Sequence, residues 1–361
     1  MINVMIIFGT RPEAIKVAPI IKELEKREET NPIVCITAQH REMLDQVLEQ
    51  FEIKPDYDLN IMKQGQTLSE ITTRAIMGLE EVIKQAKPDI ILVHGDTTTT
   101  FAGALAAFYN MVPIGHIEAG LRTYNKYSPY PEEMNRQMVT RLSDFNFAPT
   151  EKAKQNLLEE GKKEGSIFVT GNTAIDALKL TIRNDDRANN EKIILLTSHR
   201  RENLGKPMEN IFNAVKKIAK EYEDVKIIYP IHKNPQIREL AHSILDGQNN
   251  IEIIEPLEVI EFHNLMNRAY LILTDSGGIQ EEAPSLGKPV LVLRDTTERP
   301  EGVEAGTLKL LGTDEQKIYE ETKRLLEDKE EYNKMAKASN PYGDGFASKR
   351  IVDVIIEKLK K

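Results

Sequence analysis

The residues that could do chemistry come directly after predicted β-strands. Asp96 and Glu118 each lie at the end of an apolar run that is predicted to form a strand, and Glu132 begins a predicted helix. Because ligands of open α/β sheets bind beyond the carboxyl ends of the strands, these three carboxylates are expected to face one site. Their mutual repulsion would favour protonation of at least one, which makes it a candidate proton carrier. Taken singly, each residue is also typical of a helix cap.

A candidate anion site follows the first strand. In Gly9-Thr10-Arg11-Pro12-Glu13, Thr10 is placed as a helix N-cap with Glu13 three residues later, the pattern of a capping box. The N–H groups of a helix N-terminus favour anions, and Arg11 and Lys16 add positive charge. The alternative is a well-capped helix with solvated charges.

The second half of the chain carries groups suited to a phosphate. His199 follows a strand and precedes two arginines, which suits a phosphate leaving group, although a lone histidine is more often structural. In Ser276-Gly277-Gly278 the absence of side chains lets backbone N–H groups approach phosphate oxygens. Glu282, further along that helix, is placed to take ribose hydroxyls. Ser-Gly-Gly alone is common in turns.

Short β-branched runs alternate with longer helical patterns along the whole chain, which predicts parallel sheets covered by crossover helices. The fold class is therefore α/β, with two doubly wound halves of six strands each and a polar linker at 181–191. The predicted strands are Asn3–Phe8, Ile33–Thr37, Ile90–His94, Pro113–Glu118, Phe145–Ala148, Ile167–Thr170, Lys192–Thr197, Val225–Pro230, Ile251–Ile254, Leu271–Thr274, Val290–Leu293 and Thr307–Leu310.

Composition narrows the class of protein. The chain has 361 residues and a single cysteine, Cys35, which excludes a disulfide scaffold. Its net charge of −9 argues against binding to nucleic acid or a membrane by bulk charge. The N-terminus lacks the features of a signal peptide, so a soluble cytoplasmic protein is expected. No dinucleotide fingerprint, phosphate loop or Cys/His metal spacing occurs, so neither a cofactor nor a metal is expected.

Long ordered segments resemble the non-hydrolysing UDP-N-acetylglucosamine 2-epimerases across essentially the whole chain. The resemblance rests on Phe8–Lys16, Thr37–Gln46, Val93–Thr100, Gly115–Arg122, Leu273–Val290 and Arg294–Pro300. It implies two Rossmann-like domains of the glycosyltransferase-B type with a central cleft, at residues 1–172 plus 343–361 and 173–342, with a C-terminal helix returning to the first domain. It also implies a homodimer and no cofactor.

The family interconverts UDP-N-acetylglucosamine and UDP-N-acetylmannosamine by eliminating UDP to form 2-acetamidoglucal and adding it back. Carried over by motif, Asp96, Glu118, Glu132 and His199 match catalytic residues. Substrate-binding positions match Arg11, Lys16, Phe262, Ser276, Gly277, Gly278, Glu282 and Arg299. Residues matching Gln39 and His232 border an activator site in some members. Leu257 departs from the family, whose bacterial members often carry Gln beside the uracil.

Three alternatives remain beside the epimerase. A glycosyltransferase of the same fold needs no acid/base set at C2, and a hydrolysing epimerase would release free N-acetylmannosamine. A sugar-nucleotide sensor would keep Ser276–Gly278 and Glu282 without needing Asp96 or Glu118.

Overall fold

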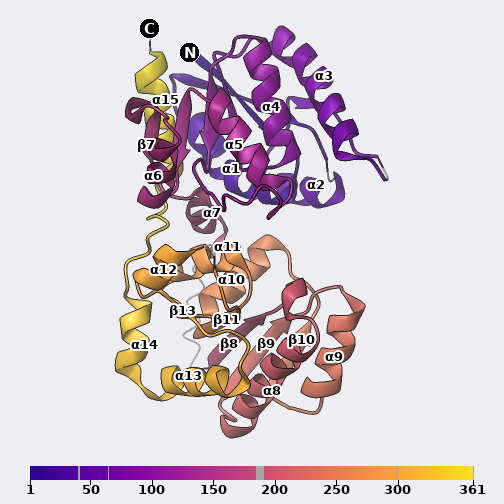
Figure 1. Cartoon of the computed structure of the whole chain (residues 1–361), viewed down its shortest axis with the longest axis vertical. Coiled ribbons are helices and arrows are strands. Elements are labelled where there is room, and N and C mark those ends of the chain that lie inside the picture. Colours follow the sequence, from indigo (N-terminus) through magenta and orange to yellow (C-terminus); the bar gives the residue numbers. More distant parts are fainter. Residues whose placement is uncertain (40, 64, 184–190, 298, 361) are drawn as a thin grey trace. The chain divides into compact units, whose positions relative to one another are not determined.

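The computed structural model describes residues 1–39, 41–63, 65–183, 191–297 and 299–360, which form two compact units (Figure 1). Unit 1 comprises Met1–Leu180 and Tyr342–Lys361, and unit 2 comprises Thr181–Pro341. The boundary between the two units thus lies at the end of helix α7 (Thr173–Thr181). The domain boundary inferred from the family resemblance lies before this helix, at residue 172. Most of the predicted linker, 184–190, lies outside the described residues.

Unit 1 is built on a parallel sheet of seven strands in the order β3-β2-β1-β4-β5-β6-β7. All the strands predicted for this half are present, with ends shifted by at most a few residues. The sequence missed the edge strand β3, which is only two residues long and therefore too short to show an alternating pattern. The strands are β1 Ile2–Phe8, β2 Thr30–Ile36, β3 Tyr57–Asp58, β4 Ile90–His94, β5 Ile114–Ile117, β6 Phe145–Ala148 and β7 Ile167–Val169.

Helices cover both faces of this sheet. Met5 and Ile7 of β1 face one way and pack with α3 and α4, whereas their neighbours Val4 and Ile6 are buried on the opposite face, where α1 lies. The helices are α1 Arg11–Glu25, α2 Arg41–Gln50, α3 Leu68–Ala86, α4 Thr98–Tyr109, α5 Glu132–Leu142, α6 Glu151–Glu159, α7 Thr173–Thr181 and α15 Ala347–Leu359, with a 3₁₀ turn at Glu164–Ser166.

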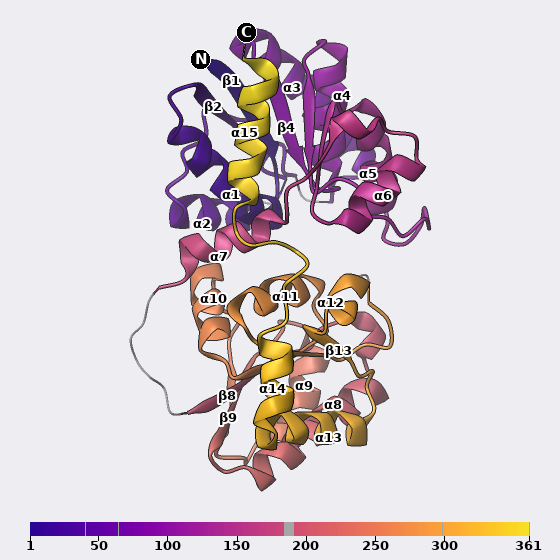
Figure 2. The same ribbon diagram turned by 90° about the vertical axis from the view of Figure 1, so that its left-hand side faces the viewer.

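The C-terminal helix α15 lies alongside α1, which confirms the predicted return of the chain to the first unit (Figure 2). The buried carboxylate of Asp176 accepts hydrogen bonds from the N–H groups of Ala347 (3.1 Å) and Ser348 (2.8 Å), and so caps α15. Further along, Arg27 of the first unit donates to Asp353 at 2.9 Å. The last helix is therefore an integral part of unit 1.

Unit 2 contains a parallel sheet of the six strands predicted from the sequence, in the order β10-β9-β8-β11-β12-β13. Its strands are β8 Lys192–Thr197, β9 Val225–Pro230, β10 Ile251–Ile254, β11 Leu271–Thr274, β12 Val290–Val292 and β13 Leu308–Leu310. Its helices are α8 Lys206–Glu221, α9 Pro235–Leu245, α10 Val259–Arg268, α11 Gly277–Glu282, α12 Pro300–Glu304, α13 Glu315–Glu327 and α14 Lys329–Ala336, with 3₁₀ turns at Arg201–Asn203 and Ala283–Leu286.

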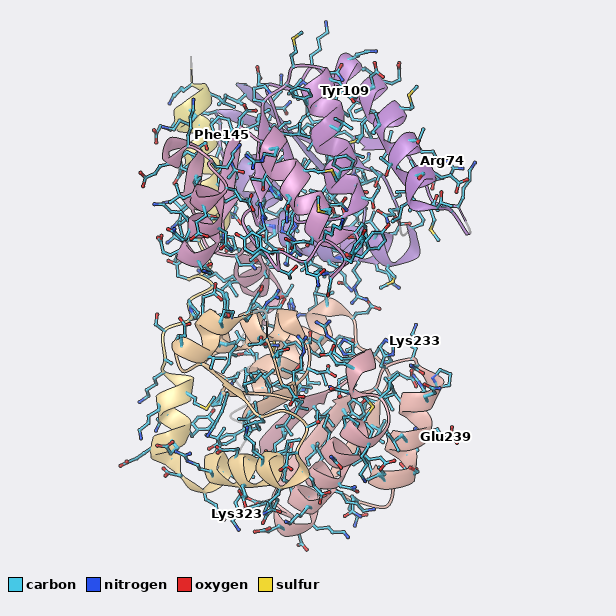
Figure 3. The ribbon with its side chains drawn as sticks, viewed as in Figure 1. Arg74, Tyr109, Phe145, Lys233, Glu239 and Lys323 are labelled. Atoms are coloured by element: carbon cyan, nitrogen blue, oxygen red, sulfur yellow. The ribbon has the colours of Figure 1, made fainter. Side chains whose placement is uncertain are left out.

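One continuous apolar core joins α8, α9 and α13 to this second sheet. Leu196, Tyr229 and Leu273 contribute to it from neighbouring strands, and Phe212 and Ile318 from the covering helices. Charged and polar side chains project outward from both units, as Figure 3 shows for Lys233 and Lys323. No helix within the described residues has the length and apolar character needed to cross a membrane.

Strand order locates the ligand-binding edge of each sheet. In unit 1 the chain winds outward in both directions from the neighbours β1 and β4, and in unit 2 from β8 and β11. Such a reversal opens a crevice beyond the carboxyl ends of the two strands, where doubly wound proteins bind ligands. The loops after β1, β4, β8 and β11 are therefore the first places to look for a site.

Candidate active site

A buried carboxylate, Glu13, joins the two loops at the reversal point of unit 1. Its Oε2 accepts hydrogen bonds from Gly9 N (3.0 Å), Thr10 N (2.9 Å) and Thr10 Oγ1 (2.8 Å), which confirms the predicted capping box. Its Oε1 accepts from Thr97 Oγ1 at 2.7 Å in the loop after β4. Burial raises the pKa of Glu13, although these hydrogen bonds oppose the shift.

This arrangement limits the anion site predicted at the N-terminus of α1. The N–H groups of Gly9 and Thr10 point at Glu13 and satisfy that carboxylate, so they are not available for a ligand phosphate. Gly9 also lies so close to the next loops that an added Cβ would approach Thr37 Oγ1 to 2.1 Å. The positive charges of Arg11 and Lys16, rather than the first N–H groups, are what this turn offers a ligand.

Glu118, the first residue after β5, is held from several sides. Lys16 Nζ donates to its Oε2 in an ion pair, and Asn172 Nδ2 donates to the same oxygen at 3.2 Å. His94 Nε2 lies 3.9 Å from this oxygen. The Glu118 side chain keeps 11% of its exposure, and its backbone has a left-handed φ of 62°, which is uncommon for a residue with a Cβ.

Asp96, after β4, is paired with a cation from α5. Arg136 Nη2 donates to Asp96 Oδ2, and Asn135 Nδ2 donates to the Asp96 carbonyl at 2.9 Å. Glu132 is the first residue of the same helix, and its Oε2 is buried without a hydrogen-bond partner in the described part of the chain. Asp96 thus follows a strand and Glu132 begins a helix, as the sequence predicted.

Cations lie beside two of the three predicted carboxylates, Asp96 and Glu118, and offset the repulsion expected there. Asp96 has Arg136 and Glu118 has Lys16, so each negative charge is balanced by a cation that the sequence analysis had not paired with it. Arg136 also contacts Glu133 at 3.3 Å. Glu133 is fully buried, and although burial raises its pKa, hydrogen bonds from Thr123, Gln137 and Tyr124 outweigh that effect and lower it overall.

Two buried histidines lie beneath these carboxylates. Burial lowers the pKa of His94 to about 4 and that of His116 to about 4, so both imidazoles are neutral at pH 7. His116 Nε2 donates to Gly95 O at 2.7 Å, which fixes the proton on that nitrogen. His94 and His116 were not selected from the sequence as site residues, although each lies at the end of a strand that leads to a carboxylate.

In unit 2 a buried aspartate, Asp275, organises the loop after β8. Its Oδ2 accepts hydrogen bonds from His199 N (2.8 Å), Arg200 N (2.9 Å) and Ser198 Oγ (3.0 Å). Asn203 Nδ2 donates to the same oxygen at 3.0 Å. Asp275 follows β11, so it joins the two loops at the reversal point of this sheet, as Glu13 does in unit 1.

His199 is positioned by this aspartate and by a second histidine. Its Nδ1 lies 3.4 Å from Asp275 Oδ1, and its ring stacks on that of His232 with centroids 5.6 Å apart and planes 14° apart. Burial lowers the pKa of His199, while Asp275 acts in the opposite direction. The predicted catalytic histidine and the predicted activator residue His232 are thus in contact.

The glycine turn after β11 begins α11 and lies against Arg299. A Cβ added at Gly277 would approach Arg299 Cζ to 3.4 Å, so a side chain there would crowd the guanidinium. Arg299 Nε donates to Glu281 at 2.8 Å. The structure therefore brings the predicted residues Ser276, Gly277, Gly278 and Arg299 together at one edge of unit 2.

Glu282 and Phe262 are joined to this edge through α10. His263, the neighbour of Phe262, is buried with its Nε2 at 3.8 Å from Glu282 Oε2, and its Nδ1 bonds Thr181 Oγ1 at 2.7 Å. Leu257 lies just before α10 and is partly buried. In unit 1 the other predicted activator residue, Gln39, accepts from Thr99 Oγ1 at 3.2 Å.

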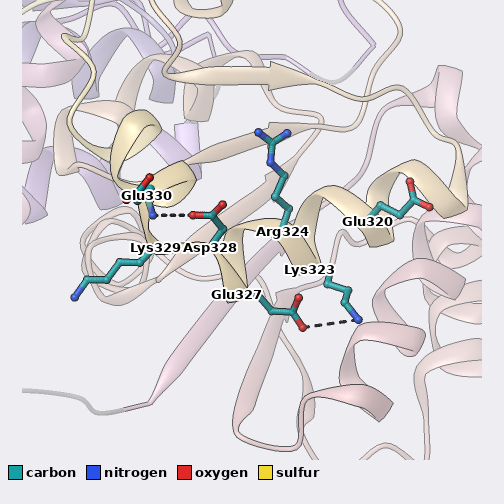
Figure 4. A pocket seen from close by; sticks show the side chains of 7 residues that line it. All are labelled: Glu320, Lys323, Arg324, Glu327, Asp328, Lys329 and Glu330. Atoms are coloured by element: carbon teal, nitrogen blue, oxygen red, sulfur yellow. Dashed lines mark hydrogen bonds and ion pairs between the residues drawn. The ribbon is translucent and has the colours of Figure 1, made fainter.

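A separate surface pocket at the end of α13 does not resemble a binding site. It is lined by charges of both signs, and dashed lines in Figure 4 mark the pairing of Lys323 with Glu327. Leu325 O nearby accepts a hydrogen bond from Tyr270, which precedes β11, so the pocket lies at the opposite edge of the sheet from His199. Within the described residues, no group of three or more His, Cys, Asp or Glu side chains is placed to hold a metal.

The chain has two doubly wound parallel units, which is the fold of the glycosyltransferase-B-like class. Carboxylates follow the strands of one unit, and a glycine turn follows a strand of the other. The family profile described as UDP-N-acetylglucosamine 2-epimerase matches residues 22–356. The chain belongs to this family.

Individual relatives match over nearly their whole length. A protein of Bacillus subtilis named UDP-N-acetylglucosamine 2-epimerase is 63% identical over 361 residues, which cover 98% of this chain and 95% of the relative. The structure of S. aureus MnaA with UDP is 59% identical with a TM-score of 0.90, and covers 100% of this chain and 97% of that one. The Neisseria meningitidis enzyme bound to UDP-GlcNAc is 53% identical with a TM-score of 0.87, covering 99% and 100%.

Proposed function

We propose that this chain interconverts UDP-N-acetylglucosamine and UDP-N-acetylmannosamine by inverting C2 of the sugar. The relatives support this substrate, since one is named for the reaction and others were solved with UDP or with UDP-GlcNAc. The observation that carries the proposal is the Glu118 carboxylate, fixed at the end of β5 by Lys16 and Asn172. A fixed, partly exposed carboxylate is what proton transfer at a sugar carbon needs.

The chemistry follows from the weak acidity of C2–H. No carbonyl lies next to C2, so loss of its proton is coupled to cleavage of the C1–O bond. One carboxylate takes the C2 proton, the electron pair forms the C1=C2 bond of 2-acetamidoglucal, and UDP leaves with the C1–O electrons. Return of a proton to the other face of C2 and re-addition of UDP at C1 give the epimer. Glu118 acts on one face, and Asp96 or Glu132 acts on the other.

Unit 2 supplies the groups for departing UDP. His199 and Arg299 are suited to the charge that develops on the diphosphate, and the backbone of Ser276, Gly277 and Gly278 is suited to its oxygens. Arg11 of unit 1 is proposed as a further binding residue. Glu282 takes the ribose hydroxyls, and Phe262 lies beside uracil. Replacement of the usual Gln by Leu257 is harmless to uracil binding if that contact uses the backbone.

Four further properties stay predictions. We expect a homodimer in the cytoplasm, without nucleic acid or membrane partners. Gln39 of unit 1 and His232 of unit 2 stay candidate residues for contact with an activating sugar nucleotide, which some members of the family bind. The stacking of His232 on His199 gives such a ligand a direct route to the leaving-group histidine.

Reaction in heavy water tests the proposal. We expect UDP-N-acetylmannosamine to form from UDP-N-acetylglucosamine with deuterium at C2, because the proton exchanges with solvent on the carboxylates. Release of free sugar with an equal amount of UDP would instead indicate a hydrolysing epimerase. Binding of UDP-N-acetylglucosamine without any turnover would indicate a sugar-nucleotide sensor.

A further inference from the structure

Asn172, which the sequence did not single out, makes a direct contact with the proposed catalytic carboxylate. Its side chain is buried, with 3% exposure, and its Nδ2 donates to Glu118 Oε2 at 3.2 Å. Asn172 lies just beyond β7 and immediately before α7, more than fifty residues from Glu118 along the chain. The contact therefore depends on the folded unit and not on local sequence.

The remaining polar groups of Asn172 fix the direction of its amide. Its Oδ1 accepts from Ala174 N at 2.9 Å, which caps α7, and its carbonyl accepts from Ile175 N at 3.1 Å. Its own N–H donates to Tyr342 O at 2.7 Å in the returning C-terminal segment. Because Oδ1 must face the helix to accept an N–H, Nδ2 must face Glu118.

We propose that Asn172 is a positioning residue that, together with Lys16, holds Glu118 Oε2 and so fixes the orientation of the carboxylate for proton transfer at C2. The assignment rests on the proposed function of Glu118. The left-handed backbone of Glu118 sets where its side chain begins, and the two donors set where it ends. A carboxylate constrained at both ends loses little orientational freedom when the substrate binds.

The charged and titratable groups around Glu118 define what a change at Asn172 would perturb. Lys16 of α1 pairs with the carboxylate, and His94 of β4 lies 3.9 Å from it. His116 of β5 and Asp96 after β4 act on this group of residues electrostatically. Lys16 is the only one of these four that carries a positive charge at pH 7, so a new negative charge at position 172 would counteract the stabilisation that Lys16 gives the Glu118 carboxylate.

Two substitutions separate positioning from helix capping. In Asn172→Ser the hydroxyl still accepts from the first turn of α7 but is too short to reach Glu118, so the fold is kept while the contact is lost. In Asn172→Asp the cap is also kept, but a second carboxylate faces Glu118 and favours the protonated form of the pair. Asn146→Ser serves as the control, because it removes a buried amide of unit 1 that donates to Ser166 O.

We expect Asn172→Ser to lower kcat about tenfold or more, with the Kd for UDP and the thermal midpoint close to wild type. We expect Asn172→Asp to move the limb of the kcat/KM pH profile that Glu118 governs upward by about one pH unit. Asn146→Ser should leave the kinetic profile unchanged.

The outcomes for the positioning role and for the proposed function are separable. If wild-type protein fails to place deuterium at C2, the proposed function is wrong. If wild-type protein is active and both Asn172 variants retain its kcat and its pH profile, Asn172 does not position Glu118. A lowered kcat in Asn172→Ser together with a shifted profile in Asn172→Asp supports the assignment, because a purely structural residue would not move the pH profile.

Discussion

The two units share one structural feature at the edge of the sheet where ligands bind, but they present different side chains there. In each, a buried carboxylate ties together the two loops at the point where the strand order reverses: Glu13 in unit 1 and Asp275 in unit 2. Beyond this shared feature the units differ. Unit 1 presents carboxylates paired with cations, Lys16 with Glu118 and Arg136 with Asp96. Unit 2 presents a glycine turn beside Arg299 and the stacked histidines His199 and His232.

This difference between the units suggests which unit carries out proton transfer and which binds the nucleotide in the proposed reaction. Proton transfer needs side chains that can gain and lose a proton, and these must be held by partners that fix their geometry. Binding a diphosphate needs donors that do not change protonation state, and a backbone freed of side chains supplies them. Under the proposed function, unit 1 would carry out the reaction at C2, and unit 2 would hold the nucleotide while the C1–O bond is broken.

The largest effect is expected from Glu118→Gln, which should lower kcat about a hundredfold or more while leaving UDP affinity unchanged. The amide keeps the size of the carboxylate but cannot accept the C2 proton. Turnover assays and calorimetric titration with UDP check this, with Glu25→Gln on the exposed side of α1 as the control. Near-normal turnover would remove Glu118 from the catalytic set and break the proposed division between the units.

The next largest effect is expected from Asp275→Asn, which should weaken UDP binding about tenfold. The amide oxygen can still accept the hydrogen bonds that Oδ2 receives from Ser198, His199 and Arg200, but the negative charge is lost. The new NH2 group then takes the place of Oδ1, which lies 3.4 Å from His199 Nδ1. Calorimetry with UDP measures the change, and Asp246→Asn, at an exposed pair with His242, is the control. An unchanged Kd would show that the loop after β8 does not hold the nucleotide.

Acid should destabilise unit 1 through its two buried histidines. Their pKa values lie at about 4, below the ordinary 6.5, so between these values the unfolded chain binds protons that the folded unit does not. Stability is therefore complete above about pH 6.5 and falls as the pH drops towards 4, by on the order of 2 kcal/mol for each histidine.

His116→Gln tests this expectation by removing one of the two groups. The loss of thermal stability between pH 7 and pH 4.5 should become smaller than in wild type, measured as the change in Tm. His242→Gln, at an exposed position of unit 2, should leave the loss unaltered. An equal pH dependence in His116→Gln and wild type would contradict the linkage.

The smallest effect concerns the attachment of α15. Asp176→Asn leaves only one acceptor for the N–H groups of Ala347 and Ser348, and should destabilise the helix by about 1 kcal/mol. Hydrogen exchange of the α15 amides measures this, and UDP affinity should not change. Asp353→Asn on the same helix removes a half-exposed ion pair with Arg27, which follows α1, and should destabilise α15 by less than Asp176→Asn does. Equal protection in Asp176→Asn and wild type would contradict the capping role.

Local patterns predicted the strands and the first capping box because both depend on neighbouring residues. Short β-branched runs located the long strands, and the spacing of Thr10 and Glu13 located the cap. The edge strand β3 was missed because two residues show no period. The candidate residues followed from their place after strands and from the family resemblance.

The partners of those residues could not be predicted, because they come from distant parts of the chain. Lys16 and Glu118 are 102 residues apart, and Asp96 and Arg136 are 40 residues apart. No local pattern indicates which of 48 Lys and Arg side chains meets which carboxylate. Asn172 was missed for the same reason, since its role depends on a contact that only the fold creates.

The return of α15 to unit 1 also has a consequence for the order of synthesis. A ribosome makes Ala347–Leu359 after all of unit 2, so the surface of α1 that α15 covers stays open until these residues emerge, even though α1 is made much earlier. Unit 2 is continuous in sequence and has all its residues by Pro341. Unit 2 can thus be completed before unit 1, although most of unit 1 is made earlier, because unit 1 needs residues that are made after unit 2.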